Sequence, residues 1–143
     1  GKMDFAVQRS GVFYRLFTSG ISISQTPFGN PNDFVVPGDY DGDGKSDLCV
    51  VGASSAFTSE AGEPAMQWTY RPSSGGPDVV QNWGFINDTP VPGDYNGDGR
   101  SDFAIWRFGA LSTFWILRSN TYQIESRQWG LLDDIPVNFT FVN

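Results

Sequence analysis

The chain has 143 residues, 39% of them hydrophobic and 15% aromatic, and a formal net charge of −7. This length suits one domain, and the aromatic content is sufficient for a packed core, which argues against a disordered chain. The acidic balance argues against nucleic acid or an anionic membrane as a partner, because both require a basic face, and no apolar stretch approaches the ~18 residues of a membrane span.

Short segments rich in β-branched and aromatic residues follow one another along the chain, separated by Gly, Ser, Asn and Pro. This pattern predicts strands and turns, and no window shows a sustained helical period of apolar residues. The expected strands are, in chain order, 5–7, 11–18, 21–25, 34–36, 48–51, 67–70, 79–83, 103–106, 113–117 and 122–126. The polar segment 53–65 is expected to be a surface loop. The sequence therefore predicts an all-β fold of short antiparallel strands.

An internal repeat groups these strands into three copies. Segment 36–48 recurs as 91–103, and stretch 13–29 matches 68–84 and 114–130 without gaps. The third copy is split between the termini: 1–7 matches 44–50 and 99–105, whereas 135–143 takes the positions of 34–42. One domain, 1–143, with repeat units of about 1–43, 44–98 and 99–143 is therefore expected. About four short strands per unit is typical of a propeller blade.

The repeated segment contains a loop crowded with carboxylates. Seven of the 16 acidic residues fall in two nine-residue windows, an arrangement that is costly unless a cation is held there. Calcium takes six to eight oxygen ligands, which Asp at alternate positions of a tight turn can supply. The candidate ligands are Asp39, Asp41, Asp43, the carbonyl of Lys45 and Asp47 in the first loop, and Asp94, Asn96, Asp98, the carbonyl of Arg100 and Asp102 in the second. Two Ca²⁺ sites are therefore predicted, the second weaker because Asn96 is neutral.

Two other interpretations of these loops fit the sequence less well than calcium binding. An EF-hand requires a bidentate Glu at its twelfth position, where this chain has Val50 or Ile105, and it requires helical flanks in place of the expected strands. An ordinary Asp/Asn/Gly turn with solvated carboxylates is common for one such residue. It is a poor explanation for four acids or amides at this spacing, present twice in the same arrangement.

These motifs resemble the FG-GAP/VCBS repeats of integrin α-subunit propellers and of many bacterial and fungal surface proteins. The marks are Phe28 with Gly29 (or Trp-Gly), Val-Pro-Gly-Asp-Tyr, and the Asp-x-Asp-x-Asp-Gly-x-x-Asp loop. The resemblance implies propeller blades, structural Ca²⁺ in the loops, and an extracellular or cell-surface role in adhesion or carbohydrate binding. The third copy departs from the pattern, since Thr140 and Val142 stand where Asp39 and Asp41 stand.

The preferred functional hypothesis is an extracellular, calcium-binding structural or adhesive module. The alternative is a lectin-like domain in which Trp106 and Trp115 stack on sugars. Catalysis is not expected, because the chain has no His and no paired carboxylates outside the loops. Cys49 is expected to be a buried small hydrophobe. Asn87 and Asn138 lie in sequons for N-glycosylation.

Self-association is the last expectation. Three blades are fewer than the roughly four to eight of a closed propeller. An open stack of three would expose two large apolar faces to solvent. The preferred expectation is that a C-terminal strand, 135–143, completes the split blade of a neighbouring copy, and copies joined in this way would form a ring or filament. In the other solution the termini meet within one molecule and another copy covers the open faces. A piece of a longer propeller is the remaining alternative.

Overall fold

The computed structural model describes residues 4–18 and 22–137, and within them every regular element is a strand. The strands are β1 (Phe5–Arg9), β2 (Val12–Leu16), β3 (Ile23–Pro27), β4 (Phe34–Val35), β5 (Leu48–Thr58), β6 (Pro64–Arg71), β7 (Val79–Phe85), β8 (Thr89–Pro90), β9 (Phe103–Arg107), β10 (Thr113–Leu117) and β11 (Ile124–Gln128). The all-β prediction is confirmed. In this part of the chain no helix has the length and apolar character needed to cross a membrane.

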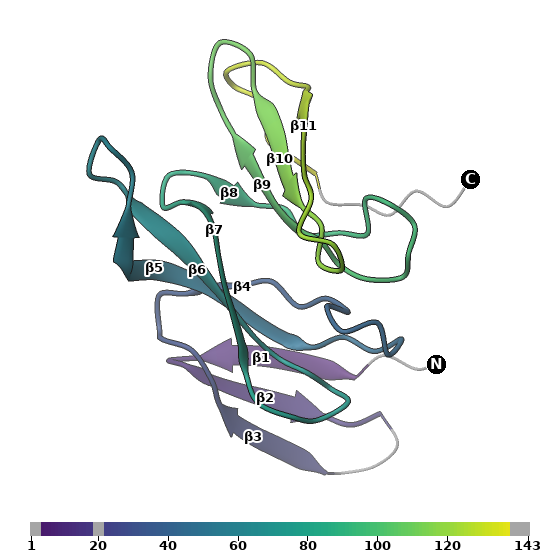
Figure 1. Cartoon of the computed structure of the whole chain (residues 1–143). Coiled ribbons are helices and arrows are strands. Elements are labelled where there is room, and N and C mark those ends of the chain that lie inside the picture. The colour runs from purple at the N-terminus through teal and green to yellow at the C-terminus, as the bar shows by residue number, and fades with distance from the viewer. Residues whose placement is uncertain (1–3, 19–21, 138–143) are drawn as a thin grey trace.

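The strands form three antiparallel sheets (Figure 1). The first sheet contains β1, β2 and β3, the second contains β4 to β7, and the third contains β8 to β11. Equivalent strands pair in equivalent register: Val7 lies opposite Tyr14 in the first sheet, Val50 opposite Thr69 in the second and Ile105 opposite Trp115 in the third. The repeat seen in the sequence is therefore also a repeat of strand pairing.

The second sheet lies between the other two (Figure 1), and apolar side chains fill both interfaces. The smaller core joins the first and second sheets and consists of Phe13, Phe28 and Val50, with Leu48 packed against them. The larger core joins the second and third sheets and consists of Tyr40, Cys49, Val51, Met66, Trp68, Phe103, Ile105 and Leu117. A separate cluster in the third sheet contains Val91, Ala104, Trp106 and Ile116.

The strands are divided among the sheets differently from the expected repeat units. The unit boundaries near 43 and 98 fall inside the Asp loops, but β4 pairs with β5 and β8 pairs with β9 across those loops. The reason is that each Asp loop is a tight turn, so the strands on either side of it become neighbours in one sheet. The sheet boundaries instead follow β3 and β7.

Segment 53–65 was expected to be a surface loop, and that prediction is wrong. β5 continues to Thr58 and β6 begins at Pro64, so the segment is an extended hairpin closed by a short turn. The pairing is irregular between Ala53 and Thr58. Ser54 and Ala65 are nevertheless buried, so part of the hairpin contributes to the protein interior.

The C-terminal strand expected at 135–143 is not present in its described part. Residues 135–137 form no strand, and Ile135 is 84% exposed. Residues 138–143 lie outside the described residues. Consequently the first sheet has three described strands where the other two have four, and the described sheets form an open stack with no closed propeller ring.

Candidate metal centre and neighbouring surfaces

The first Asp loop, residues 39–46, connects β4 to β5 and is closed by a bridge between Gly38 and Asp47, whose amide donates to the Gly38 carbonyl over 2.7 Å. The backbone turns back within this short span by using two left-handed residues, Gly42 at φ 80° and Gly44 at φ 82°. A side chain would be strained at such φ values, so glycine is required there.

The turn brings three acidic side chains together. Asp39, Asp41 and Asp43 each offer one carboxylate oxygen, and these atoms lie within 4.8 Å of one another, so the group could hold a metal ion. Backbone amides orient the Asp39 carboxylate: Gly42 donates to Oδ1 over 2.7 Å and Gly44 donates to Oδ2 over 2.8 Å. Hard oxygen donors of this kind suit Ca²⁺ or Mg²⁺.

Two serines after β6 bond to the same carboxylates. The Ser73 hydroxyl donates to Asp43 Oδ2 over 2.7 Å, and the Ser74 hydroxyl donates to Asp41 Oδ2. The hydrogen bond from Ser73 lowers the pKa of Asp43 below its ordinary value, with smaller contributions from Lys45. Asp43 is therefore ionised at neutral pH, which is the state that a cation requires.

Asp47 was expected to complete the ligand shell, but it lies outside this carboxylate group. Its buried carboxylate accepts backbone N–H bonds from Tyr40 over 2.8 Å, from Asp41 over 3.3 Å and from Ser73 over 2.7 Å. Burial raises the pKa of Asp47, and the charge of Asp41 adds to this, although the backbone hydrogen bonds act in the opposite direction. In this structure Asp47 connects the loop to the turn after β6.

The second Asp loop, residues 94–101, has the same backbone arrangement between β8 and β9. Gly97 and Gly99 are left-handed, and their amides donate to Asp94 over 2.7 and 2.8 Å, as in the first loop. Asn96 Oδ1 accepts from the Asp98 amide over 3.0 Å, and the Asn96 side-chain amide donates to Asp98 Oδ2 over 3.0 Å. The second loop therefore offers two carboxylates and one amide oxygen at the positions where the first offers three carboxylates.

Asp102, the counterpart of Asp47, also has other partners. It is fully buried and accepts the Ser119 amide over 3.0 Å and the Arg118 guanidinium over 2.8 Å. Asp102 was expected to be a metal ligand, but in this structure the Arg118 guanidinium already neutralises its carboxylate. Lys45 and Arg100 were expected to contribute carbonyl oxygens, and the bonds seen in the structure are from their amides to Asp43 and Asp98.

The two loops lie beside each other at one end of the sheets. The Ser101 amide donates to the Asp39 carbonyl over 2.6 Å, and the Arg100 side chain lies against Gly42. The ring of Tyr40, which follows Asp39, stacks on the rings of Tyr70 and Phe103, with centroid distances of 5.2 Å and 5.4 Å. The first loop is thereby attached to the larger core.

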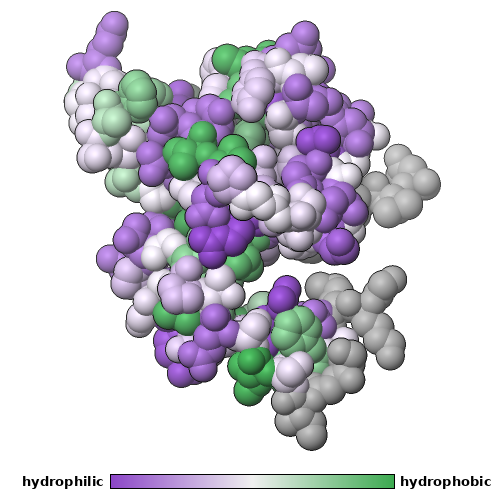
Figure 2. Space-filling model, turned by 60° about the horizontal axis from the view of Figure 1, so that its bottom comes forward, coloured by the Kyte–Doolittle hydropathy of each residue, from purple (hydrophilic) through white to green (hydrophobic). Residues whose placement is uncertain are grey.

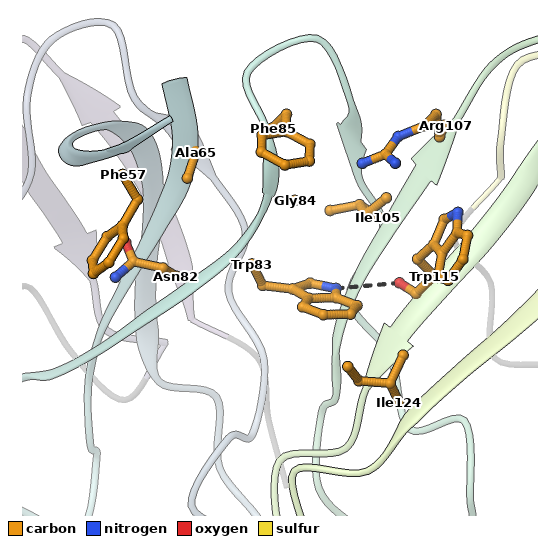
Figure 3. A pocket seen from close by; sticks show the side chains of 10 residues that line it. All are labelled: Phe57, Ala65, Asn82, Trp83, Gly84, Phe85, Ile105, Arg107, Trp115 and Ile124. Atoms are coloured by element: carbon orange, nitrogen blue, oxygen red, sulfur yellow. Dashed lines mark hydrogen bonds between the residues drawn. The ribbon is translucent and has the colours of Figure 1, made fainter. Parts of the chain in front are cut away.

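The two tryptophans expected to stack on sugars differ in their surroundings. Trp106 is 4% exposed and packs in the cluster with Val91 and Ile116, so its ring has no free face, and the stacking role predicted for it is wrong. Trp115 lines an open apolar pocket of about 450 Å³ between the second and third sheets (Figure 3). The Trp83 indole N–H donates to the Trp115 carbonyl over 3.3 Å, which joins β7 to β10 in the wall of this pocket (Figure 3).

The three remaining predicted positions are one cysteine and two asparagines. Cys49 is fully buried, as expected, and burial raises the pKa of its thiol to about 12. Asn87 is exposed on the turn after β7, where its side-chain amide donates to Glu63 over 2.7 Å. Asn138 lies outside the described residues. The use of either sequon stays a prediction.

Three equivalent aspartates before the sheet boundaries cap turns, and the sequence missed only the ion pair that one of them forms. Asp33, Asp88 and Asp134 each accept the backbone amide three residues earlier over 2.8 Å, closing the same tight turn at 30–33, 85–88 and 131–134. A turn-capping role was expected for them. The additional ion pair between Asp88 and Arg107 was not, although Arg107 at the end of an apolar strand was a visible signal.

Comparison of the chain with protein-family models, with curated proteins and with solved structures finds no match. The resemblance to FG-GAP/VCBS repeats therefore depends on the residues of the Asp loops and of the Gly-containing turns alone.

Proposed function

We propose that this chain is a calcium-binding structural module that works outside the cell, in adhesion or in the scaffold of a surface assembly, and that it associates with copies of itself. The observation that carries the proposal is the convergence of Asp39, Asp41 and Asp43 in one short loop, with backbone amides already orienting the carboxylates. No residue of the chain is assigned a catalytic role in this proposal.

Calcium would act mainly on stability. The first Asp loop joins β4 to β5 and the second joins β8 to β9, so an ion in either loop ties the first strand of a sheet to its neighbour. Two bound Ca²⁺ ions would also reduce the net charge from −7 to −3 and relieve repulsion within the loops. A ligand that binds only the folded state raises stability by mass action.

The two sites are expected to differ in affinity. The first loop has three clustered carboxylates, whereas the second replaces one of them with neutral Asn96, so it attracts a divalent cation less strongly. The buried Asp102 carboxylate already has Arg118 as its counter-ion, which leaves it less charge to offer a metal. Occupancy of the first loop should therefore account for most of the stabilisation.

A melting experiment tests the proposal. Millimolar calcium should raise the melting temperature and excess chelator should lower it, and Asp43→Asn should remove most of this response. Asp98→Asn should remove the smaller remainder, while Glu60→Gln, an exposed acid on the hairpin turn, serves as the matched control. An unchanged melting curve together with no calcium by elemental analysis would contradict the proposal.

A second candidate function is supported by the apolar pocket between the second and third sheets. Trp83 and Trp115 line it, and Arg107 and Asn82 supply polar groups at its edge (Figure 3). Aromatic rings with a few polar neighbours are the usual lining of sugar-binding and small-molecule sites. A glycan array with calcium-loaded protein distinguishes this lectin-like function, since loss of a positive signal in Trp115→Ala would assign binding to this pocket.

A further inference from the structure

The outer edge of β1 differs from the edges of its counterparts in the other two sheets. β4 covers the edge of β5, with Val35 opposite Val50, and β8 covers the edge of β9, with Pro90 opposite Ile105. β1 pairs with β2, and no described strand lies on its other side. Its backbone hydrogen-bonding groups therefore form an unpaired edge, which is a template for strand addition.

Side chains of β1 are exposed where the equivalent side chains are buried. Val7 is 59% exposed, whereas its counterparts Val50 and Ile105 are 3% and 1% exposed. Phe5 is largely exposed, whereas its counterpart Phe103 is buried. The end of the molecule that carries the first sheet is turned forward in Figure 2, where apolar side chains are visible among polar ones. The sequence of β1 is therefore that of a buried strand, although the strand is exposed to solvent in the single chain.

The segment that would fill this edge is identified by the connecting turns. Turn 30–33 leads from the first sheet into β4 of the second, and turn 85–88 leads from the second sheet into β8 of the third. Turn 131–134 has the same hydrogen bond, from the Leu131 amide to Asp134 over 2.8 Å, and it leads into residues 135–137. By position in the repeat, these residues are the first strand of a following sheet.

Exposure around the third turn supports the same conclusion. Phe28, before the first connecting turn, is 6% exposed because it packs on Val50 of the next sheet, whereas its counterpart Trp129 is 79% exposed. A side chain added at Gly29 would lie 2.9 Å from Val50, and one added at Gly84 would lie 2.9 Å from Ile105. The counterpart Gly130 has only atoms of its own sheet and turn around it.

An ion pair at the second sheet boundary provides charge complementarity. Arg107 Nε and Nη2 both donate to the Asp88 carboxylate over 2.7 Å, which fixes turn 85–88 against β9. The counterparts are Arg9 at the end of β1 and Asp134 in the third turn, and both are exposed. In the described structure the Asp134 carboxylate accepts from the Leu131 amide, and the Arg9 guanidinium lies over the ring of Tyr14.

We propose that residues 135–137 of one copy add as an antiparallel strand to the edge of β1 in a second copy. The register follows from β4 and β8: Ile135 lies opposite Gln8, Pro136 lies opposite Val7, and the Val137 amide donates to the Ala6 carbonyl, as Val36 does to Cys49 over 3.0 Å and Val91 does to Ala104 over 2.8 Å. Arg9 then pairs with Asp134, and Trp129 packs on Val7.

The partner is a second copy because of the order of the sheets. Turn 131–134 leaves the third sheet and β1 belongs to the first sheet, with the second sheet between them (Figure 1). The contact is head to tail, so it extends the stack from one copy to the next and closes only when the rotation completes a ring. Two copies supply six sheets, within the range of four to eight that closed propellers use. The proposal specifies the partner and register of the proposed self-association and does not depend on calcium binding.

Sedimentation velocity of the 143-residue chain over a range of concentrations tests this contact. Wild type should assemble, and Arg9→Glu should weaken assembly by roughly tenfold or more, because it places two carboxylates opposite each other. Arg15→Glu changes the same charge on the neighbouring strand and should leave assembly unchanged. A wild-type chain that stays monomeric at every concentration overturns the proposal, as does equal behaviour of the two variants.

A mixing experiment then tests polarity. Val137→Pro removes the amide that would donate to β1 and leaves the β1 edge intact, whereas Ala6→Pro blocks that edge and leaves the C-terminal segment intact. Each variant alone should be monomeric, and an equimolar mixture should form a 1:1 complex and nothing larger. Assembly of either variant alone, or no complex on mixing when circular dichroism shows both folded, overturns the head-to-tail arrangement.

The calcium response is measured separately on the Val137→Pro variant, which is expected to be monomeric. A melting temperature that still rises with calcium when assembly has failed shows that the calcium proposal stands on its own. Conversely, assembly that persists in chelator shows that the strand contact stands when calcium binding fails. The two proposals therefore fail independently.

Discussion

At the scale of single residues, one aspartate position has a role that its motif does not reveal. Asp47 and Asp102 close the Asp-rich pattern, yet both are buried and accept the backbone amide of a serine after the following hairpin. Asp4 does the same with the Thr18 amide over 3.0 Å. The spacing of a carboxylate in the sequence does not distinguish a metal ligand from a residue that holds two turns together. The two roles differ in which side chains and amides surround the carboxylate in the folded chain.

The pair of Arg118 with Asp102 gives a prediction at this scale. Arg118→Met keeps much of the apolar stem and removes the cation, so the buried Asp102 carboxylate is left with backbone amides alone. Removing one partner of a buried pair costs about 3 to 5 kcal/mol, so urea unfolding in chelator should show a loss of this size. Arg127→Met, at an exposed position, is the control. If Arg118→Met lowered the free energy of unfolding by no more than the control does, the buried Asp102 carboxylate would not need its counter-ion.

Cys49 gives a second prediction. The thiol is fully buried and its pKa is raised to about 12 from 9.0, so the folded state disfavours the reactive thiolate. At pH 8 the thiol of the native protein should not be alkylated. Labelling should occur only through unfolded molecules, at the rate of unfolding. Because the pKa is higher in the folded state, stability should fall as pH rises above 9.0, where the unfolded thiol ionises first. Rapid labelling of native protein would contradict the burial of this side chain.

At the scale of elements, the sequence predicts most strands and fails where tertiary context decides. Segment 113–117 matches β10, because its apolar run is bounded by turn residues on both sides. β8 was not predicted, since two residues that include Pro90 carry no strand pattern, and only the neighbouring β9 makes them a strand. The hairpin at 53–65 was missed for a related reason: its polar residues face solvent on a strand that is held by pairing with its partner.

The turn of this hairpin yields a prediction about proteolysis. Glu60 is exposed in the turn between β5 and β6, whose hydrogen bonds are local, from Ser59 to Glu63 and from Gly62 to Ser59. A glutamate-specific protease should therefore cleave after Glu60 well before it cleaves after Glu125, which lies in β11 and is bonded to Arg118. Mass spectrometry identifies the first cut. The nicked chain should keep its calcium response, because the Asp loops are remote from this turn in sequence and pairing.

At the scale of the whole molecule, the two sheet interfaces are unequal. The core between the second and third sheets has eight buried residues, including Trp68 and Tyr40, whereas that between the first and second has three. Hydrophobic stabilisation scales with the apolar area removed from water, so the first sheet is held less strongly. The sequence could not predict this inequality, because Phe13 and Trp68 are both aromatic residues at the same repeat position, and the number of residues that pack around each depends on the neighbouring sheet.

This inequality predicts that the first sheet opens independently of the other two. In the Val137→Pro variant, which is expected to be monomeric with its β1 edge intact, amides of β1 and β2 should exchange with solvent at least roughly tenfold faster than those of β9 and β10, because sub-global opening needs to break only the smaller core. Hydrogen exchange followed by mass spectrometry measures both sets in one sample. In assembled wild type, a strand added to β1 should slow exchange in the first sheet and leave β9 and β10 unchanged. Equal protection of all sheets in the monomer would mean that the three sheets unfold as one unit, and the smaller core would then be sufficient to hold β1 in place.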